Sequence, residues 1–374
     1  MGFEFISTSA GLQGAAKRIE GEPLLAFDLE ADSMHHYREK VCLIQISTPT
    51  AAFVVDPLAC PDISVLKPVF ANPFSCKIFH GADYDVRSLY RDFGIEINNL
   101  FDTMIACQFL GETEFGLAAV LRRRFGVELN KRFQQADWSR RPISTEMLDY
   151  AVKDTTLLIP LYMQLEFELR SKGRWEWVRE ECELLSKVRA SERRDDQLFL
   201  RFKGASKMSP PTLAVLENLL RFREMEAERR DVPPFKVLGN EVLKSLAERK
   251  PATLAELDGV TGLSPRLIQR YGEALLMVVS DGVSLPLELL PHFPHSPRKK
   301  RAPEYEARLK NLKSWREEKS ERTGLAPGLI ANNALLESIA DKSSAQDREL
   351  LLGELKQWQR HEFGSELAAI LECP

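Results

Sequence analysis

The chain has 374 residues, of which 44% are hydrophobic and 28% are charged. This ordinary globular composition excludes a disordered or fibrous protein, and the length predicts two or three domains because a single core rarely grows so large. The net charge is −4 at pH 7, which excludes a protein that holds nucleic acid by an overall positive charge.

Compartment and membrane partners can be judged from the apolar runs and the cysteines. No apolar run approaches the roughly 18–20 residues that cross a bilayer, and the N-terminus lacks the basic-then-apolar pattern of a secretion signal. The six cysteines show no CxxC spacing, which is typical of reduced thiols and not of disulfides or a zinc site. We therefore expect a cytoplasmic protein with no membrane partner.

The first part of the chain alternates β-rich and helix-like segments. Three runs near the start predict an antiparallel meander: Leu24–Glu30, Val41–Ser47 and Ala51–Asp56. Further segments then follow in order: a loose helix at Ile63–Phe70, a strand at Cys76–His80, a helix at Asp85–Phe93, an extended piece at Leu100–Thr103, helices at Met104–Leu110 and Leu117–Phe125, and one long helix from about Ser144 to Leu169 with Pro160 as a point for a kink. This order predicts a mixed α/β sheet.

The second half has no strand signal and contains a repeat. From about Val178 the apolar residues recur at helical spacing. Residues 216–247 align without a gap on residues 309–340, at an offset of 93, with 12 identities in 32 positions. After a one-residue shift, Tyr271 and Gly272 match Phe363 and Gly364. A period of this length indicates duplicated helical domains and not a solenoid of short repeats.

Asp28 and Glu30 stand two apart in a β-rich run, so both carboxylates project from one face of the strand. Two neighbouring charges in a buried strand are costly, and a divalent cation would compensate them directly. The alternative is a pair of carboxylates at the fraying end of a strand.

Three further residues carry weaker signals. Asp85 begins a helix-like run, where a simple helix N-cap is the alternative, as it is for Asp83. Tyr150 and Asp154 stand four apart in a helix and therefore share a face, where a Tyr–Asp hydrogen bond on a solvated surface is the alternative. As an ordered set, four carboxylates can hold two hard cations for phosphodiester hydrolysis, and a nearby phenol can orient the attacking water.

Four segments together resemble ribonuclease D, a DEDD exonuclease of the subclass with a tyrosine before the last aspartate. They are FDLEADSMHHYREKVCLIQIS, FHGADYDVRSLYRDFG, LFDTMIACQFLG and ADWSRRPISTEMLDYAVKDTTLLIPLY. The two repeated units resemble HRDC domains. The resemblance implies an α/β RNase H-like exonuclease domain over residues 1–175, followed by two small all-α HRDC-type helical domains over residues 205–288 and 302–374.

The resemblance also implies roles for individual residues. Asp28, Glu30, Asp85 and Asp154 would hold two divalent metal ions, Mg²⁺ or Mn²⁺, and Tyr150 would position the nucleophile. A basic stretch at residues 121–141 contains aromatic residues that could stack on bases. From it and the family pattern we list candidate RNA-binding residues: Lys131, Trp138, Arg141 and His80. The alternative for them is a solvated helix face with Trp138 in the core.

These observations predict a 3′→5′ exoribonuclease that releases nucleoside 5′-monophosphates. The family implies substrates with a single-stranded 3′ end, such as tRNA precursors, and we expect a monomer. One alternative is a DNA 3′→5′ exonuclease, because the motifs read a phosphodiester and not the sugar. The other is a non-catalytic RNA-binding adaptor that uses the repeated helical units.

Overall fold

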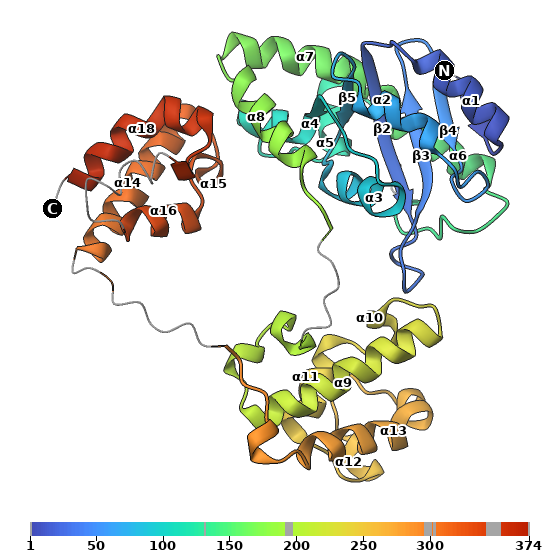
Figure 1. The fold of residues 1–374 in the computed structure, drawn as a ribbon, viewed down its shortest axis with the longest axis vertical. Coiled ribbons are helices and arrows are strands. Elements are labelled where there is room, and N and C mark those ends of the chain that lie inside the picture. Colours follow the sequence, from blue (N-terminus) through green and yellow to red (C-terminus); the bar gives the residue numbers. More distant parts are fainter. Residues whose placement is uncertain are drawn as a thin grey trace. The chain divides into compact units, whose positions relative to one another are not determined.

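The computed structural model describes residues 2–130, 132–190, 197–294, 301, 304–341 and 353–372. The chain divides into two compact units (Figure 1). The first contains Met1–Ala31, Val41–Ala190 and Lys299–Pro374, and the second contains Asp32–Lys40 and Ser191–Arg298. Within the described ranges, no helix combines the length and the apolar character that crossing a membrane requires.

A six-stranded mixed sheet forms the centre of the first unit, in the order β1-β4-β3-β2-β5-β6 (Figure 1). Strands β2, β3 and β4 are antiparallel neighbours, whereas the β1–β4, β2–β5 and β5–β6 pairs are parallel. This confirms the expected meander within an α/β sheet. The strands are β1 (Glu4–Ile6), β2 (Leu24–Ala31), β3 (Val41–Ser47), β4 (Ala52–Val55), β5 (Cys76–Phe79) and β6 (Leu100–Asp102).

Helices cover both faces of this sheet. Helix α6 packs on β2, β3 and β4, and the main apolar core lies on the opposite face. The helices of this part are α1 (Ser9–Ile19), η1 (Ser64–Leu66), α2 (Lys67–Ala71), α3 (Asp83–Phe93), α4 (Thr103–Leu110), α5 (Leu117–Phe125), α6 (Thr145–Thr156), α7 (Leu158–Ser171) and α8 (Trp175–Ser186).

Two features differ from the sequence prediction. The long helix expected from about Ser144 to Leu169 is wrong, because α6 ends at Thr156 and α7 begins at Leu158, with Leu157 outside helical geometry at φ −104° and ψ 0°. Pro160 then lies in the first turn of α7, where its missing N–H costs nothing. Strand β1 and helix α1 were not predicted; β1 has three residues, of which only Ile6 is buried, so it carries no alternating apolar signal.

In the described residues of the C-terminal half, all regular elements are helices, and they form two repeats. The first helical repeat contains α9 (Pro210–Arg229), α10 (Pro234–Val237), α11 (Asn240–Arg249), α12 (Leu254–Asp258) and α13 (Pro265–Val283). The second helical repeat contains α14 (Tyr305–Thr323), α15 (Pro327–Ile330), α16 (Asn333–Ala340) and α18 (Gln357–Glu372). Short 3₁₀ segments flank the first repeat: η2 (Leu198–Arg201), η3 (Ala205–Lys207) and η4 (Leu287–Leu289).

The two repeats share details that confirm the duplication. Helices α10 and α15 occupy equivalent positions and each begins with a proline. Arg223 donates to Asn240 Oδ1 at 2.7 Å, and the equivalent Arg316 donates to Asn333 Oδ1 at 2.9 Å. The two matched aromatic pairs are also both edge-to-face: Phe222 with Tyr271 and Trp315 with Phe363. The alignment at offset 93 therefore identifies structurally equivalent residues.

Within the first unit, the second helical repeat docks on the sheet domain through Trp358. Its ring stacks on Trp177 with centroids 4.8 Å apart and meets Phe109 edge-on at 5.5 Å. Its indole Nε1 donates to Glu181 at 2.9 Å, and its backbone N–H donates to Glu180 at 2.9 Å. Glu180 thus supplies a cap for the N-terminus of α18 from the sheet domain.

Trp358→Ala is expected to destabilise the first unit by about 3–5 kcal/mol, because it removes a buried aromatic side chain and leaves a cavity. The matched control is Arg266→Ala, since Arg266 occupies the equivalent position of the first helical repeat and is exposed. Thermal unfolding of both variants checks this prediction. Equal transition midpoints for Trp358→Ala and the wild type would show that the docking contributes no stability.

Candidate active site

Asp28 and Glu30 lie on the central strand β2 and point to the face that α6 covers. Between them, Leu29 belongs with Phe27 to the main core on the opposite face. The apolar residues therefore anchor the strand and leave both carboxyl groups aimed at α6.

Asp85 is 8% exposed and lies in the first turn of α3. The turn that leads into this helix contains Gly81, whose φ of 77° suits glycine. Asp102 holds this turn, because its carboxylate accepts from the backbone N–H groups of Gly81 at 2.9 Å and Ala82 at 2.8 Å. The same side chain accepts from Met104 and caps α4. Asp102 therefore fixes the turn that positions Asp85.

The N-cap position of α3 is occupied by Ala82, and neither nearby aspartate caps the helix. Asp83 is at the surface, where Arg87 donates to it at 2.7 Å in an ion pair one turn along the helix. Asp85 is instead enclosed on the side of the carboxyl cluster. Burial thus distinguishes Asp85, which the sequence assigned to the site, from the nearby Asp83.

Tyr150 and Asp154 project from α6, whose N-terminus is capped by Ser144 through the N–H of Met147. Their spacing of four residues places both on one face of the helix. Asp154 lies in the last turn, where the helix dipole disfavours a negative charge. The fold therefore holds this carboxylate at a position that is unfavourable for an isolated acid.

The structure brings the predicted carboxylates together. One oxygen from each of Asp28, Glu30 and Asp154 lies within 4.8 Å of the others. Asp85 lies close enough that its charge also raises the pKa values of Asp28 and Glu30. Residues separated widely in the chain thus converge on one site.

Burial and mutual repulsion dominate the protonation of these groups. Burial, and then the neighbouring carboxylates, raise the pKa of Asp28 well above its usual range and that of Glu30 to about 9. Burial raises the pKa values of Asp85 and Asp154 to about 7. Such a cluster is unfavourable when ionised unless cations neutralise it, and hard divalent ions prefer these oxygen donors. The donor set therefore fits divalent metal ions.

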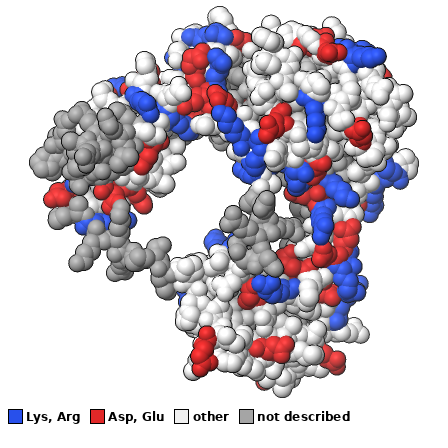
Figure 2. Space-filling view, in the orientation of Figure 1, with Lys and Arg blue, Asp and Glu red and all other residues white. Residues whose placement is uncertain are grey.

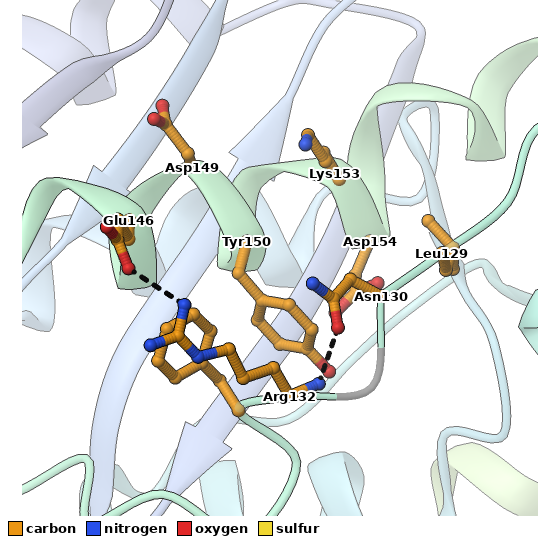
Figure 3. Close-up of a pocket in the computed structure, with 9 residues that line it drawn as sticks. Leu129, Asn130, Arg132, Glu146, Asp149, Tyr150, Lys153 and Asp154 are labelled. Carbon is orange, nitrogen blue, oxygen red and sulfur yellow. Dashed lines mark hydrogen bonds and ion pairs between the residues drawn. The ribbon is translucent and has the colours of Figure 1, made fainter.

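Two hollows meet at Tyr150 and Asp154. One has a volume of about 330 Å³ and is lined by Asp28 and His80 among others. The other, of about 250 Å³, extends along α6 to Glu146 and Lys153 (Figure 3). Figure 3 shows the Tyr150 ring and Asp154 directed to the same side of the helix as Asn130, with Asp149 turned away. The acidic cluster is therefore reachable from the surface.

Comparison with known proteins identifies the domains. A family model described as 3′-5′ exonuclease matches residues 3–170, and the HRDC domain model matches residues 212–279 and 306–371. A ribonuclease D of Nitrobacter hamburgensis is 30% identical over 373 residues, which cover 98% of this chain and 94% of that protein. The chain belongs to the ribonuclease D family. It is accordingly a metal-dependent 3′→5′ exoribonuclease in type, with an RNase H-like nuclease domain and HRDC helical domains.

Solved structures support the ribonuclease D assignment. The crystal structure of Escherichia coli RNase D superposes with a TM-score of 0.72 at 26% identity and covers 100% of this chain and 99% of that chain. The catalytic core of Trypanosoma brucei RRP6 superposes with a TM-score of 0.66 at 33% identity, over 76% of this chain and 81% of that chain. Together with the acidic cluster, the family implies divalent metal ions and an RNA substrate.

The candidate RNA-binding residues of this ribonuclease D family member lie in different structural environments. Lys131 lies outside the described residues. Trp138 is 1% exposed and packs beside Tyr150 in the core under α6, so it cannot stack on a base in this structure. Arg141 forms a two-pronged ion pair with buried Asp56, each contact 2.7 Å, and also donates to backbone carbonyls. These contacts favour a structural role for both Trp138 and Arg141.

Among the RNA-binding candidates that the structure describes, His80 alone lines the site. Its Nδ1 lies 2.8 Å from Thr103 Oγ1, and Thr103 in turn donates to the carbonyl of Phe79. Burial lowers the pKa of His80, so the imidazole is neutral at physiological pH. A neutral, oriented ring beside Asp28 suits contact with a sugar or base more than with a phosphate.

Sequence reasoning missed residues that shape the site. Leu129 and Asn130 line both hollows, and although they lie within the basic stretch 121–141, the sequence did not single out either residue. Asp102 lies within the segment LFDTMIACQFLG, but only its contacts with Gly81 and Ala82 show that it orients the turn before Asp85. On the face that Figure 2 shows, acidic and basic side chains are interspersed.

Proposed function

We propose that this enzyme hydrolyses RNA from its 3′ end by a two-metal mechanism and releases nucleoside 5′-monophosphates. The convergence of Asp28, Glu30 and Asp154 within 4.8 Å, with Asp85 beside them, carries this proposal. When bound, two divalent ions would activate a water and stabilise the leaving oxygen of an in-line displacement. The side chains of this protein would bind those ions and orient the attacking water.

The carboxylates would divide the ligation between them. Asp28, on the central strand, would hold the ions together with Glu30 and Asp154, whose oxygens lie within 4.8 Å of its own. Asp85 would add a fourth carboxylate to this set. Because Asp102 holds the turn before α3 rigidly, Asp85 needs little reorganisation when metal enters.

Tyr150 would orient the attacking water through its hydroxyl group. Its ring is fixed edge-on against Phe133, with centroids 5.7 Å apart, and lies beside Trp138. Burial first, and the neighbouring carboxylates second, raise the pKa of Tyr150 above its ordinary value. The phenol therefore keeps its proton at neutral pH without metal and can donate a hydrogen bond to the attacking water.

For the substrate, we propose RNA with a single-stranded 3′ end, with tRNA precursors as the physiological class. The E. coli RNase D structure is described as that of an exoribonuclease involved in structured RNA processing, which supports this choice. The two small hollows suit the end of one strand more than a duplex. We further propose that a monomer acts in the cytoplasm, where the five described, buried cysteines would remain free thiols.

Matched RNA and DNA oligonucleotides test the substrate. With Mg²⁺ and a 5′ label, we expect RNA to shorten stepwise from its 3′ end at least about tenfold faster than DNA, since one hydrogen bond to the 2′-hydroxyl is worth about that factor. Chromatography of the released products should show nucleoside 5′-monophosphates. Equal rates on both would support the DNA exonuclease, and binding without metal-dependent cleavage would support the non-catalytic adaptor.

A further inference from the structure

Gln45 lies directly across the sheet from Asp28. In the antiparallel β2–β3 pair these two residues are register partners, and on its other side Gln45 pairs with Val54 of β4. Directly opposite residues project from the same face, with Cβ atoms about 4.5–5.5 Å apart. The amide of Gln45 is therefore a close neighbour of the carboxylate that sits at the centre of the acidic cluster.

The side chain of Gln45 is fully buried and unsatisfied. Its exposed fraction is 0%, and among the described residues neither Oε1 nor Nε2 has a hydrogen-bond partner. Helix α6 packs over this part of β3 and excludes solvent. A buried amide without partners costs free energy comparable with lost hydrogen bonds, so this amide needs a partner in the functional state.

The side chains around Gln45 are mostly apolar and give no reason for a polar residue at this position. The same face of the sheet and α6 contribute apolar side chains that include Leu43, Val54, Ala151 and Val152. An apolar residue of similar length would fill this space without the cost of an unpaired amide. Ser47, two residues further on, shows the contrasting case, because its hydroxyl lies 2.7 Å from that of Thr155 and is satisfied within the fold.

The carboxylate of Asp28 is the nearby acceptor to which this amide can donate a hydrogen bond. Its carboxylate accepts a hydrogen bond from the backbone of Leu29, and the charged groups around it are the carboxylates of Asp154, Asp85 and Glu30, which cannot donate when ionised. Carboxylates that ligate metals are themselves held by hydrogen-bond donors, and such partners set metal affinity. Gln45 Nε2 is placed to be this donor.

We infer that Gln45 is a positioning residue for the metal site: its side-chain amide donates to the Asp28 carboxylate when that carboxylate binds a divalent ion. The inference rests on the proposed metal site. Gln45 does not touch the substrate or the ions in this role. It orients a carboxylate that would hold the ions, and metal binding gives Nε2 a partner, which removes part of the cost of the unpaired amide.

Two apolar replacements, Gln45→Met and Gln45→Leu, test the role with Mn²⁺ as the probe. Calorimetric titration of Mn²⁺ into the full chain should show about 10–100-fold weaker binding for both variants. Their metal-free thermal midpoints should equal or exceed that of the wild type, because an unsatisfied amide has been removed. The gain in midpoint on adding Mn²⁺ should shrink in parallel.

Ser47→Ala is the matched control on the same face of β3. It should lower the metal-free midpoint, through loss of the contact with Thr155, and leave Mn²⁺ affinity unchanged. Wild-type Mn²⁺ affinity in the Gln45 variants, or metal-free destabilisation of both, would overturn the inference and make the amide structural. Failure of the metal site itself is distinguishable, since the wild type would then bind no Mn²⁺.

Discussion

Asp154→Asn is expected to lower the rate of RNA hydrolysis about 1,000-fold or more while leaving the fold intact. The substitution keeps the shape of the side chain but removes one charged oxygen donor from the group that lies within 4.8 Å of Asp28 and Glu30. Metal ions contribute several kcal/mol of charge stabilisation in the transition state, and about 4 kcal/mol corresponds to this factor. Single-turnover digestion of a labelled RNA at saturating Mg²⁺ measures the change.

Asp83→Asn is the matched control for this prediction. Asp83 is also a helical aspartate, but it is exposed, and hydrogen bonds from Arg87 lower its pKa instead of raising it. Its replacement should leave hydrolysis unchanged and cost no more than about 0.5 kcal/mol, as exposed ion pairs of this type usually do. Comparable rates for Asp154→Asn and Asp83→Asn would refute the assignment of the acidic cluster as the catalytic site.

The stabilisation of the enzyme by Mg²⁺ is expected to increase steeply with pH. Without metal, burial gives Asp154 a pKa of about 7 and Glu30, helped by its neighbours, a pKa of about 9, whereas the same groups ionise near pH 4 in the unfolded chain. Between these values the folded state binds more protons, so metal-free stability falls as the pH rises, by up to about 1.4 kcal/mol per pH unit for each group. Metal binding requires the ionised form and reverses this loss.

Thermal midpoints with EDTA and with Mg²⁺, measured at intervals from pH 5.5 to pH 9, test this linkage. The difference between the two conditions is the useful quantity, because groups remote from the metal contribute equally to both. It should grow across the range in the wild type and grow less in Asp154→Asn, which has lost one titrating ligand. A gain from Mg²⁺ that is the same at pH 5.5 and pH 8.5 would contradict the raised pKa values.

The local sequence was enough to predict which side of its strand or helix each candidate site residue occupies. Alternation along β2 placed Asp28 and Glu30 on one face, and the spacing of four on α6 did the same for Tyr150 and Asp154. These periodicities are properties of the backbone and need no knowledge of the rest of the molecule. The helical duplication was equally accessible, because an ungapped alignment at constant offset depends only on residue identity.

Other features depended on contacts between segments remote in the chain. From the sequence, the basic stretch that contains Trp138 and Arg141 resembled an RNA-binding surface. In the structure, the indole of Trp138 is buried in the core under α6, and the guanidinium of Arg141 is paired with Asp56. The break at Leu157 likewise follows from packing, since α6 covers β2, β3 and β4 whereas α7 packs on β2 and β5.

The sequence by itself therefore determined which chemical groups this ribonuclease D family member has and which face of each strand or helix carries them. Only the tertiary structure decided which polar groups are buried, paired or left without a partner, as Gln45, Arg141 and Asp102 show. The physical reason is that periodicity is set by backbone geometry within a few residues. Burial and hydrogen bonding are instead set by strands and helices that the chain brings together from far apart.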